Sequence, residues 1–269
     1  MRRISNADGK PDLAGFVNTY DIVEILINTT SVASVSAALN GASFAKGVGV
    51  TPGSLISVFG TGFAAANALA QSIPLPVSLG NVSVTVDGIP ASLQFVSSGQ
   101  INLQVPWEIT SSTADVVVTA NGNVLPAFHA HIAPVAPGIF STQFGTGQAI
   151  AINPDSSLAG PENSIPAVAV RPAKIGGVLE ILVTGLGAVS PTVADGADTL
   201  DGLRQTAITP TVLIGGVSAT VSFSGLAPQF VGVNQLNVIV PQVAPGVVPL
   251  QINAGGITTS SQVKIAVSR

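Results

Sequence analysis

Glycine and proline recur so often along this chain that they exclude long helices. The 269 residues include 29 glycines and 19 prolines, about one in every six positions. Both residues interrupt helices, because glycine is too flexible and proline lacks a backbone N–H. The short runs between them alternate apolar residues with Ser, Thr, Asn or Gln, as in 82–86 and 236–240. This period of two is typical of half-buried antiparallel strands, so the sequence predicts an all-β fold, with 64–72 as its one short helix candidate.

Charge and hydropathy narrow the classes of partner. Asp, Glu, Lys and Arg make up only 8% of the chain, and the net charge is -4. Binding to nucleic acid depends on clustered Lys and Arg, so no nucleic-acid partner is predicted. The mean hydropathy is +0.58, but no apolar run approaches the ~18 residues of a spanning helix, so no membrane span is predicted. The chain has no cysteine, which excludes disulfides and thiolate chemistry.

The chain contains an internal repeat. Residues 84–95 match 212–223, and residues 100–106 match 235–241 in the same order. Two copies of one β-sandwich explain this pattern. The predicted organisation has four parts: an extended N-terminal arm at 1–45, a first sandwich at 46–136, a linker with a β-hairpin at 137–165 and a second sandwich at 166–269. The hairpin is expected at 147–155, more naturally as part of the second half than of the first.

Several motifs resemble a known family. They are Ala-Leu-Asn-Gly-Ala-Ser-Phe at 38–44, the run at 52–63 that ends in Gly-Thr-Gly-Phe, Gln-Ile-Asn-x-x-Val-Pro at 100–106, Pro-Gly-Ile-Phe at 137–140 and Gly-Gln-Ala-x-Ala-x-Asn at 147–153. Together they resemble the uncharacterised Solibacter-type C-terminal domain family over most of the chain. Each half also resembles an IPT/TIG immunoglobulin-like sandwich. The resemblance implies two tandem immunoglobulin-like β-sandwiches in a bacterial protein that is secreted or exposed at the cell surface, and it implies no known activity.

The first 30 residues resemble one blade edge of an FG-GAP (VCBS) propeller repeat. In that pattern a loop with closely spaced oxygen ligands binds calcium. Asn6, Asp8 and Asp12 match ligand positions, whereas the first Asp of the pattern falls on Ile4. The resemblance therefore makes Asn6, Asp8 and Asp12 a candidate calcium site with one ligand missing. A plain Asp-Gly turn is the alternative.

The N-terminal arm also carries a predicted strand. Its apolar residues are Ile22, Val23, Ile25, Leu26 and Ile27, and we expect no partner for it in a chain-local hairpin. Sheet edges pair readily with other strands unless charge guards them, and this chain has nine Lys and Arg in total. We therefore expect the arm to add to a sheet edge of another copy, or of its own chain. A head-to-tail contact of this kind gives a filament, which predicts an extracellular structural or adhesive protein that forms a homo-polymer.

Two clusters of polar residues are candidate cation sites. His129 and His131 lie two positions apart and so share one face of a strand, where two imidazoles could begin a metal site. The alternative is two polar residues on the solvent face of that strand. Asp195, Asp198 and Asp201 form the densest acidic run. Their spacing fits no EF-hand loop, so a solvated loop is expected there.

Enzyme motifs and aromatic residues separate the remaining functions. The chain has no Gly-x-Ser-x-Gly elbow, no His-Glu-x-x-His and no Walker loop, so no enzyme is predicted. Sugar-binding sites often stack pyranose rings on exposed aromatic rings. Trp107 is the single tryptophan and is the best candidate for such a contact. A carbohydrate-binding or accessory module of a larger secreted protein, with surface glycans as partners, is therefore the alternative to self-assembly.

Overall fold

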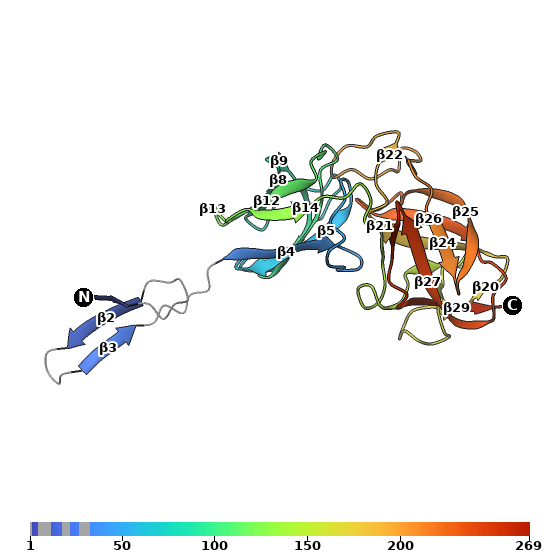
Figure 1. Cartoon of the computed structure of the whole chain (residues 1–269), viewed down its shortest axis with the longest axis horizontal. Coiled ribbons are helices and arrows are strands. Elements are labelled where there is room, and N and C mark those ends of the chain that lie inside the picture. Colours follow the sequence, from blue (N-terminus) through green and yellow to red (C-terminus); the bar gives the residue numbers. More distant parts are fainter. Residues whose placement is uncertain (1, 5–11, 18–21, 27–32) are drawn as a thin grey trace. The chain divides into compact units, whose positions relative to one another are not determined.

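The computed structural model describes residues 2–4, 12–17, 22–26 and 33–269, which fall into two units, Met1–Val32 and Ala33–Arg269. Every regular element in the described ranges is a β-strand (Figure 1). The all-β prediction is confirmed, and the chain carries two tandem immunoglobulin-like sandwiches. The prediction of a helix at 64–72 is wrong, because this segment forms bends and the short strand β6 (Ala68–Leu69). In the described ranges no helix is long and apolar enough to cross a membrane.

The N-terminal unit contains a three-stranded antiparallel sheet in the order β1-β2-β3. Its strands are β1 (Arg2–Ile4), β2 (Asp12–Val17) and β3 (Ile22–Leu26). β3 pairs with β2 along its whole length, from Leu13 opposite Leu26 to Val17 opposite Ile22. The expectation that this strand lacks a chain-local partner is wrong. The partner is β2, which begins at Asp12, the last residue of the candidate calcium loop.

The first sandwich consists of two sheets that enclose a buried apolar core, which includes Ile56, Leu103 and Val118. One sheet has the order β4-β5-β11-β10-β6 and the other β13-β12-β8-β7, with β14 on β12 and β9 on β8. The strands of the first sheet are β4 (Ser34–Asn40), β5 (Leu55–Thr61), β10 (Ser92–Val96) and β11 (Gln100–Gln104). Those of the second are β7 (Ser78–Leu79), β8 (Val82–Val86), β9 (Ile89–Pro90), β12 (Thr113–Ala120), β13 (Asn123–Val124) and β14 (Phe128–His131).

One predicted boundary of the first sandwich changes. The predicted arm includes residues 34–40. In the structure these residues form β4, which pairs antiparallel with β5, with Leu39 opposite Ser57. The partly buried Ala38 of β4 packs against the core of the first sandwich. The apolar residues of 34–40 therefore complete this sandwich, and the arm ends before it.

The second sandwich has its own buried core, which includes Ile181, Leu236 and Leu250. Its main strands run in the order β29-β27-β24-β25-β26-β21-β17-β18-β19. These strands are β17 (Ala151–Ile152), β18 (Leu158–Ala159), β19 (Val170–Arg171), β21 (Val178–Thr184), β24 (Thr211–Ile214), β25 (Val217–Leu226), β26 (Asn234–Ile239), β27 (Gly246–Ala254) and β29 (Val263–Ser268). Shorter strands attach to them: β15 (Gly138–Ile139), β16 (Gly147–Gln148), β20 (Ala173–Lys174), β22 (Val189–Ser190), β23 (Gln205–Thr206) and β28 (Ile257–Thr258).

The predicted linker at 137–165 is also corrected. β15 and β17 both pair with β21, so this segment belongs to the second sandwich. The hairpin expected at 147–155 does not form within those residues. Instead β16 pairs in parallel with β29, and β17 turns back onto β18, with Ile152 opposite Leu158.

The internal repeat is visible in the strand pairing. The order β5-β11-β10 of the first sandwich corresponds to β21-β26-β25 of the second. A β-bulge lies between Leu93 and Phe95 in the first copy and between Val221 and Phe223 in the second. These residues occupy equivalent places in the two repeats, so the copies share even this local irregularity.

Hydrogen bonds join the two sandwiches. The buried N–H of Leu55 lies 3.1 Å from the Gly232 carbonyl and 3.0 Å from the Thr184 hydroxyl. The N–H of Gly196 donates to the Gln104 side-chain oxygen at 2.6 Å, and its carbonyl accepts from the Leu75 N–H at 2.8 Å. The two copies therefore meet through specific, partly buried polar contacts, which is consistent with their forming one compact unit.

Candidate binding groove

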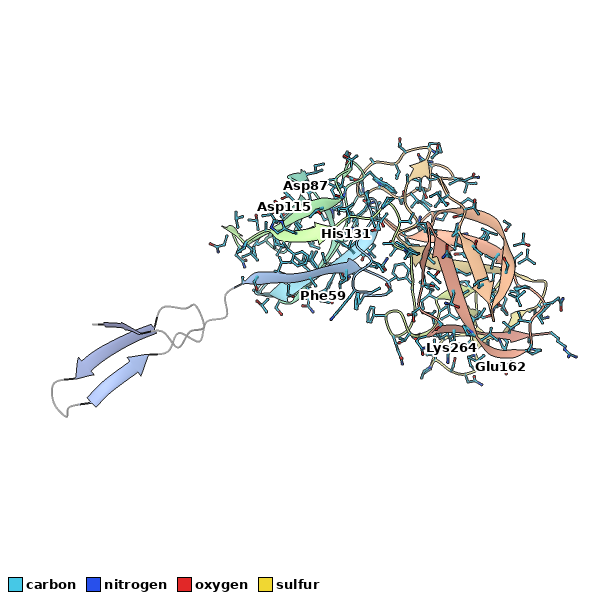
Figure 2. All side chains as sticks on the ribbon, in the orientation of Figure 1. Phe59, Asp87, Asp115, His131, Glu162 and Lys264 are labelled. Carbon is cyan, nitrogen blue, oxygen red and sulfur yellow. The ribbon has the colours of Figure 1, made fainter. Side chains whose placement is uncertain are left out.

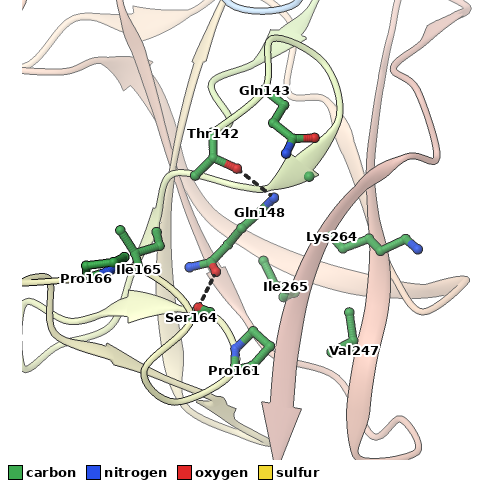
Figure 3. Close-up of a pocket in the computed structure, with 11 residues that line it drawn as sticks. Thr142, Gln143, Gln148, Pro161, Ser164, Ile165, Pro166, Val247, Lys264 and Ile265 are labelled. Carbon is green, nitrogen blue, oxygen red and sulfur yellow. Dashed lines mark hydrogen bonds between the residues drawn. The ribbon is translucent and has the colours of Figure 1, made fainter.

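A groove of about 500 Å³ lies on the second sandwich (Figure 3). One wall is the segment 142–148, which consists of the end of the loop after β15 and of β16. The other wall is the segment 161–166 between β18 and β19. The floor comes from β27 and β29 and includes Val247, Lys264 and Ile265. Two irregular segments of a regular frame therefore create the groove.

The amide of Gln148 is the central polar group of the groove. Its oxygen accepts a hydrogen bond from the Ser164 hydroxyl at 2.8 Å, which connects the two walls. Its nitrogen is buried and has no hydrogen-bond partner among the described residues. A Cβ at position 160 would lie 2.3 Å or less from the amide atoms of Gln148, so glycine at 160 makes room for this side chain. A buried N–H₂ group of this kind calls for an acceptor from water or from a ligand.

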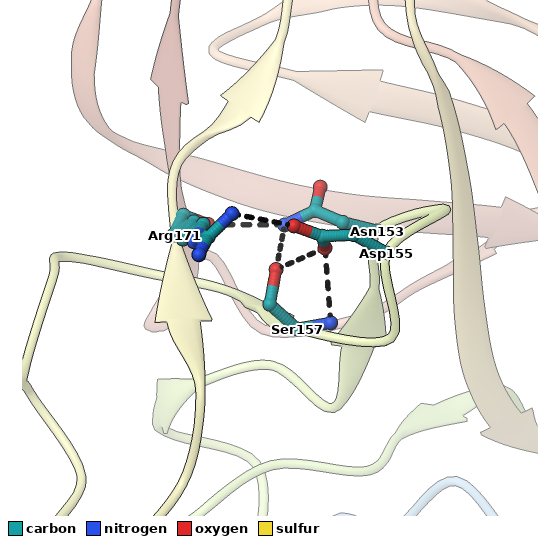
Figure 4. A network of polar contacts seen from close by, with 4 residues as sticks. All are labelled: Asn153, Asp155, Ser157 and Arg171. Atoms are coloured by element: carbon teal, nitrogen blue, oxygen red, sulfur yellow. Dashed lines mark hydrogen bonds and ion pairs between the residues drawn. The ribbon is translucent and has the colours of Figure 1, made fainter.

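A network of four residues secures the base of the second wall (Figure 4). Asp155 accepts from the Ser157 hydroxyl at 2.5 Å and from Arg171 at 3.0 Å, while the Asn153 amide donates to the Arg171 carbonyl at 3.1 Å. The Ser157 hydroxyl and backbone N–H, followed by the charge of Arg171, hold the pKa of Asp155 below its ordinary value. The network ties the β17–β18 turn to β19, and the wall segment 161–166 runs between these anchored ends.

The first wall carries an exposed aromatic ring. Phe144 stacks on Phe44 with ring centroids 4.2 Å apart and an interplanar angle of 11°. Phe44 in turn meets the edge of Phe59 at 5.0 Å and 88°. The Phe144 residue is 58% exposed. An apolar ring therefore lies at the surface next to Gln143, which lines the groove.

Charge is sparse along the groove. Of the described residues that line it, Lys264 is the only charged one, and it lies on β29 at the surface of the second sandwich (Figure 2). The rest of the lining consists of amide, hydroxyl, proline and aliphatic groups. This composition suits a ligand that presents hydroxyl groups and apolar C–H faces together.

One face of the Trp107 ring, the predicted sugar contact, is covered. Its indole lies over Gly53, where a Cβ would come within 2.2 Å of the ring. Its N–H is buried and has no partner among the described residues. Trp107 also borders Gly185 and Gly187 of the second sandwich. The ring therefore packs at the junction of the two sandwiches, a role that the sequence repeat could not reveal because the equivalent position in the second copy is Gln242.

The two histidines follow the surface alternative. His129 and His131 are exposed on β14, while Ala130 between them is buried. The Nδ1 atom of His129 lies 2.6 Å from the Asp115 carboxylate. Within the described ranges no three His, Cys, Asp or Glu side chains cluster in a way that could hold a metal ion. The third ligand that a site at His129 and His131 would need is thus not found there.

The N-terminal candidates are only partly described. Asn6 and Asp8 lie outside the described residues, and Asp12 is the first residue of β2. The calcium site therefore stays a prediction. Among the strand-donating residues, Ile22, Val23, Ile25 and Leu26 belong to β3, whereas Ile27 lies outside the described residues.

The acidic run at 195–201 has structural contacts. Asp201 pairs with Arg204 at 2.8 Å, and Asp195 accepts from the backbone N–H of Trp107 at 3.1 Å. Burial, and secondarily the nearby Glu108 carboxylate, raises the pKa of Asp195 to about 6, although the Trp107 N–H acts in the opposite direction. Asp195 therefore lies at the contact between the sandwiches, where its charge is unfavourable.

Comparison with known proteins gives matches among solved structures alone. No protein-family model matches the chain, and no curated protein matches it in sequence. Among solved structures it is similar to SGBP-B of the Bacteroides ovatus mixed-linkage glucan utilization locus, in complex with a mixed-linkage heptasaccharide, at 11% identity and a TM-score of 0.34 over 83% of this chain and 43% of that one. It is also similar to domains 5–6 of the S-layer protein SbsC, at 12% identity and a TM-score of 0.27 over 88% of this chain and 98% of that one. The I9–I11 tandem from titin gives 9% identity and a TM-score of 0.23 over 95% of this chain and 73% of that one.

All three similarities are weak, with TM-scores below 0.5, and none of them carries an argument about this chain. The chain spans less than half the length of SGBP-B. Any function of this chain therefore has to be argued from the groove. The resemblance to the Solibacter-type family stays a prediction.

Proposed function

We propose that this chain is a non-enzymatic carbohydrate-binding protein that acts outside the cell or at its surface, as a module of a larger secreted protein. The groove on the second sandwich is its binding site. The observation that carries the proposal is the Gln148 amide, which bridges the two walls through Ser164 and keeps a buried N–H₂ group without a partner among the described residues.

The chemistry of the groove suits a sugar. The hydroxyl groups of a sugar both donate and accept hydrogen bonds, and amide side chains match both roles. Gln148 and Gln143 supply amides, and Lys264 supplies donors for hydroxyl or carboxylate oxygens. Pro161 and the exposed Val247 offer apolar surface to the C–H face of a ring. A ligand that satisfies the Gln148 N–H₂ group gains specificity from it, because an analogue without an acceptor there leaves the group unpaired.

The same lining favours binding over hydrolysis. Most glycosidases use two carboxyl groups that flank the bond to be cleaved. Lys264 is the charged residue that lines the groove, and Glu162 of the second wall adds one carboxylate, which is fewer than the two that this chemistry needs. We therefore propose that a bound glycan leaves the groove unchanged.

The test is affinity gel electrophoresis of the full chain against mixed-linkage β-glucan, xyloglucan, xylan and polygalacturonate. We expect at least one polysaccharide to retard the wild type. Gln148→Ala should raise the Kd about five- to ten-fold, as expected for loss of a ligand hydrogen bond. Gln71→Ala is the matched control, because Gln71 is an exposed glutamine of the first sandwich whose amide contacts the Leu69 carbonyl. No retardation by any polysaccharide, or equal retardation of Gln148→Ala, would contradict the proposal.

We propose self-association as a second candidate function. The observation that favours it is the position of β3 at the end of the β1-β2-β3 sheet, where a strand from another copy has an edge to pair with. The test is deletion of residues 1–32, which leaves β4 intact in the first sandwich, followed by sedimentation and electron microscopy. Polymers of the full chain that persist after the deletion would rule out strand donation by this unit.

A further inference from the structure

The Phe44–Phe144 stack has an unusual backbone. Both residues have positive φ angles, 51° for Phe44 and 45° for Phe144. In this left-handed region a bulky residue is a genuine outlier, and it persists only where the surrounding structure holds it in place. Two phenylalanines meet face to face although both occupy strained conformations. Strain of this kind often marks ligand-binding sites.

The loop that carries Phe144 is held firmly in place. The N–H of Gly145 donates to the Ser141 hydroxyl at 2.9 Å, and the Thr146 hydroxyl donates to the Gln143 carbonyl at 3.1 Å. A Cβ at position 145 would lie 2.8 Å from the Ser43 carbonyl, so this loop packs against the loop that precedes Phe44. The Phe144 ring is therefore pre-positioned, and a ligand would bind it at little cost in side-chain entropy.

The ring belongs to the segment that forms the first wall of the groove. Thr142, Gln143, Gly147 and Gln148 of this segment line the groove, whereas Phe144 between them is not one of the lining residues. One ring face lies against Phe44, and the residue is 58% exposed, so the solvent reaches the rest of the ring. The apolar C–H face of a pyranose is complementary to an exposed aromatic ring.

We propose that Phe144, supported by Phe44, is a stacking subsite for a second sugar unit, so that the site takes an oligosaccharide rather than a single sugar. This inference rests on the proposed function of the groove. The hydroxyl-bearing edge of one unit binds Gln148 and its neighbours, and the next unit along the chain lies on Phe144. The subsite also explains why a phenylalanine stays exposed on a strained backbone.

The test is isothermal titration of the full chain with oligosaccharides of increasing length, prepared from the polysaccharide that retards the wild type. Phe144→Ala should raise the Kd about ten-fold for the long oligosaccharide, equivalent to ~1.4 kcal/mol, and much less for the disaccharide. Phe144→Trp should keep the wild-type affinity. Phe230→Ala is the matched control, because Phe230 is a similarly exposed phenylalanine (49%) of the second sandwich that lies between β25 and β26, outside both walls of the groove.

The outcomes separate the two proposals. If Gln148→Ala weakens binding and Phe144→Ala does not, the groove proposal stands and the stacking subsite is overturned. An equal loss for Phe144→Ala and Phe230→Ala also overturns the subsite. If no polysaccharide binds the wild type, both proposals fall. Thermal denaturation of each variant shows whether it is folded, and Phe144→Trp keeps the test valid if Phe144→Ala is not.

Discussion

The two sandwiches share a frame but differ at one edge. In the first sandwich a single seven-residue strand, β4, runs along β5. In the second sandwich the same edge, on β21, is occupied by two two-residue strands, β15 and β17. Residues 142–148 follow β15, and residues 161–166 follow β18. These two segments form the walls of the groove. A broken edge thus creates a site that the continuous edge of the first copy does not provide.

This difference shows how function can be added to a repeated fold. The shared strands bury their apolar residues in two similar cores. The wall residues lie in segments with no counterpart in the repeat, and side-chain contacts such as those of Asp155 with Ser157 and of Gln148 with Ser164 hold these segments in place. The shared strands, the contact between the sandwiches and the edge on β21 therefore depend on different residues.

The largest effect on stability is expected for the buried cores of the two sandwiches. Ile101 and Leu236 are equivalent repeat positions, and both are 0% exposed. Replacing either with alanine removes buried methyl groups and leaves a cavity, at a cost of about 2–5 kcal/mol in the free energy of unfolding. Urea denaturation of Ile101→Ala and Leu236→Ala measures both costs. If only one variant is destabilised, the two copies do not have equivalent cores.

The contact between the copies should give the next largest effect. Gln104 is 1% exposed and accepts from the Gly196 N–H, whereas the second copy has Ile239 at the equivalent position. Gln104→Ile leaves the Gly196 N–H buried and unpaired, which should cost about 1–3 kcal/mol. The reverse exchange, Ile239→Gln, serves as the control and should cost less, because Ile239 is only half-buried. Equal denaturation midpoints for Gln104→Ile and the wild type would contradict the role of this contact.

Sequence patterns predict the frame well and the groove poorly. Alternation in segments such as 82–86 identifies strands, and the match of Phe95 with Phe223 identifies the repeat. These signals work because each strand buries one face wherever the chain folds. The Gly-Gln-Ala motif contains Gln148 but does not indicate its role, and no motif contains Phe144. Their roles depend on Ser164 and Phe44, which are distant in sequence and which only the folded chain brings near.

The acidic residue at the contact should make stability depend on pH. The pKa of Asp195 is about 6 in the folded chain, above its ordinary value of 3.8, so the folded state holds a proton that the unfolded state has lost. The contribution of Asp195 to stability is therefore complete below pH 3.8 and is lost as the pH rises through 6. We expect the Tm of the wild type to fall between pH 5 and pH 7.

Asp195→Asn isolates this contribution. Its amide oxygen can still accept from the Trp107 N–H, but it does not titrate. The fall in Tm between pH 5 and pH 7 should be smaller in Asp195→Asn than in the wild type. Glu180, whose pKa is also raised by burial, remains in both proteins and so cancels in the comparison. Identical pH profiles would show that Asp195 titrates normally.

The smallest effect on stability is expected for two exposed side-chain pairs, one taken from each sandwich. Arg171 pairs with Asp155 on the second sandwich, and His129 pairs with Asp115 on the first. Such pairs contribute little, because water screens them and two side chains must be ordered. Arg171→Ala and His129→Ala should therefore shift the midpoint of urea denaturation less than Gln104→Ile does. A larger shift for Arg171→Ala would mean that the wall network stabilises the whole second sandwich.

Carbohydrate binding at the broken edge of the second sandwich can be located by hydrogen–deuterium exchange of the full chain, with and without an oligosaccharide of the retarding polysaccharide. We predict that the ligand slows exchange in 142–148 and 162–165, the two walls of the groove, and leaves β4 and β5 of the first sandwich unchanged. Protection of the first sandwich with none at these walls would contradict the account.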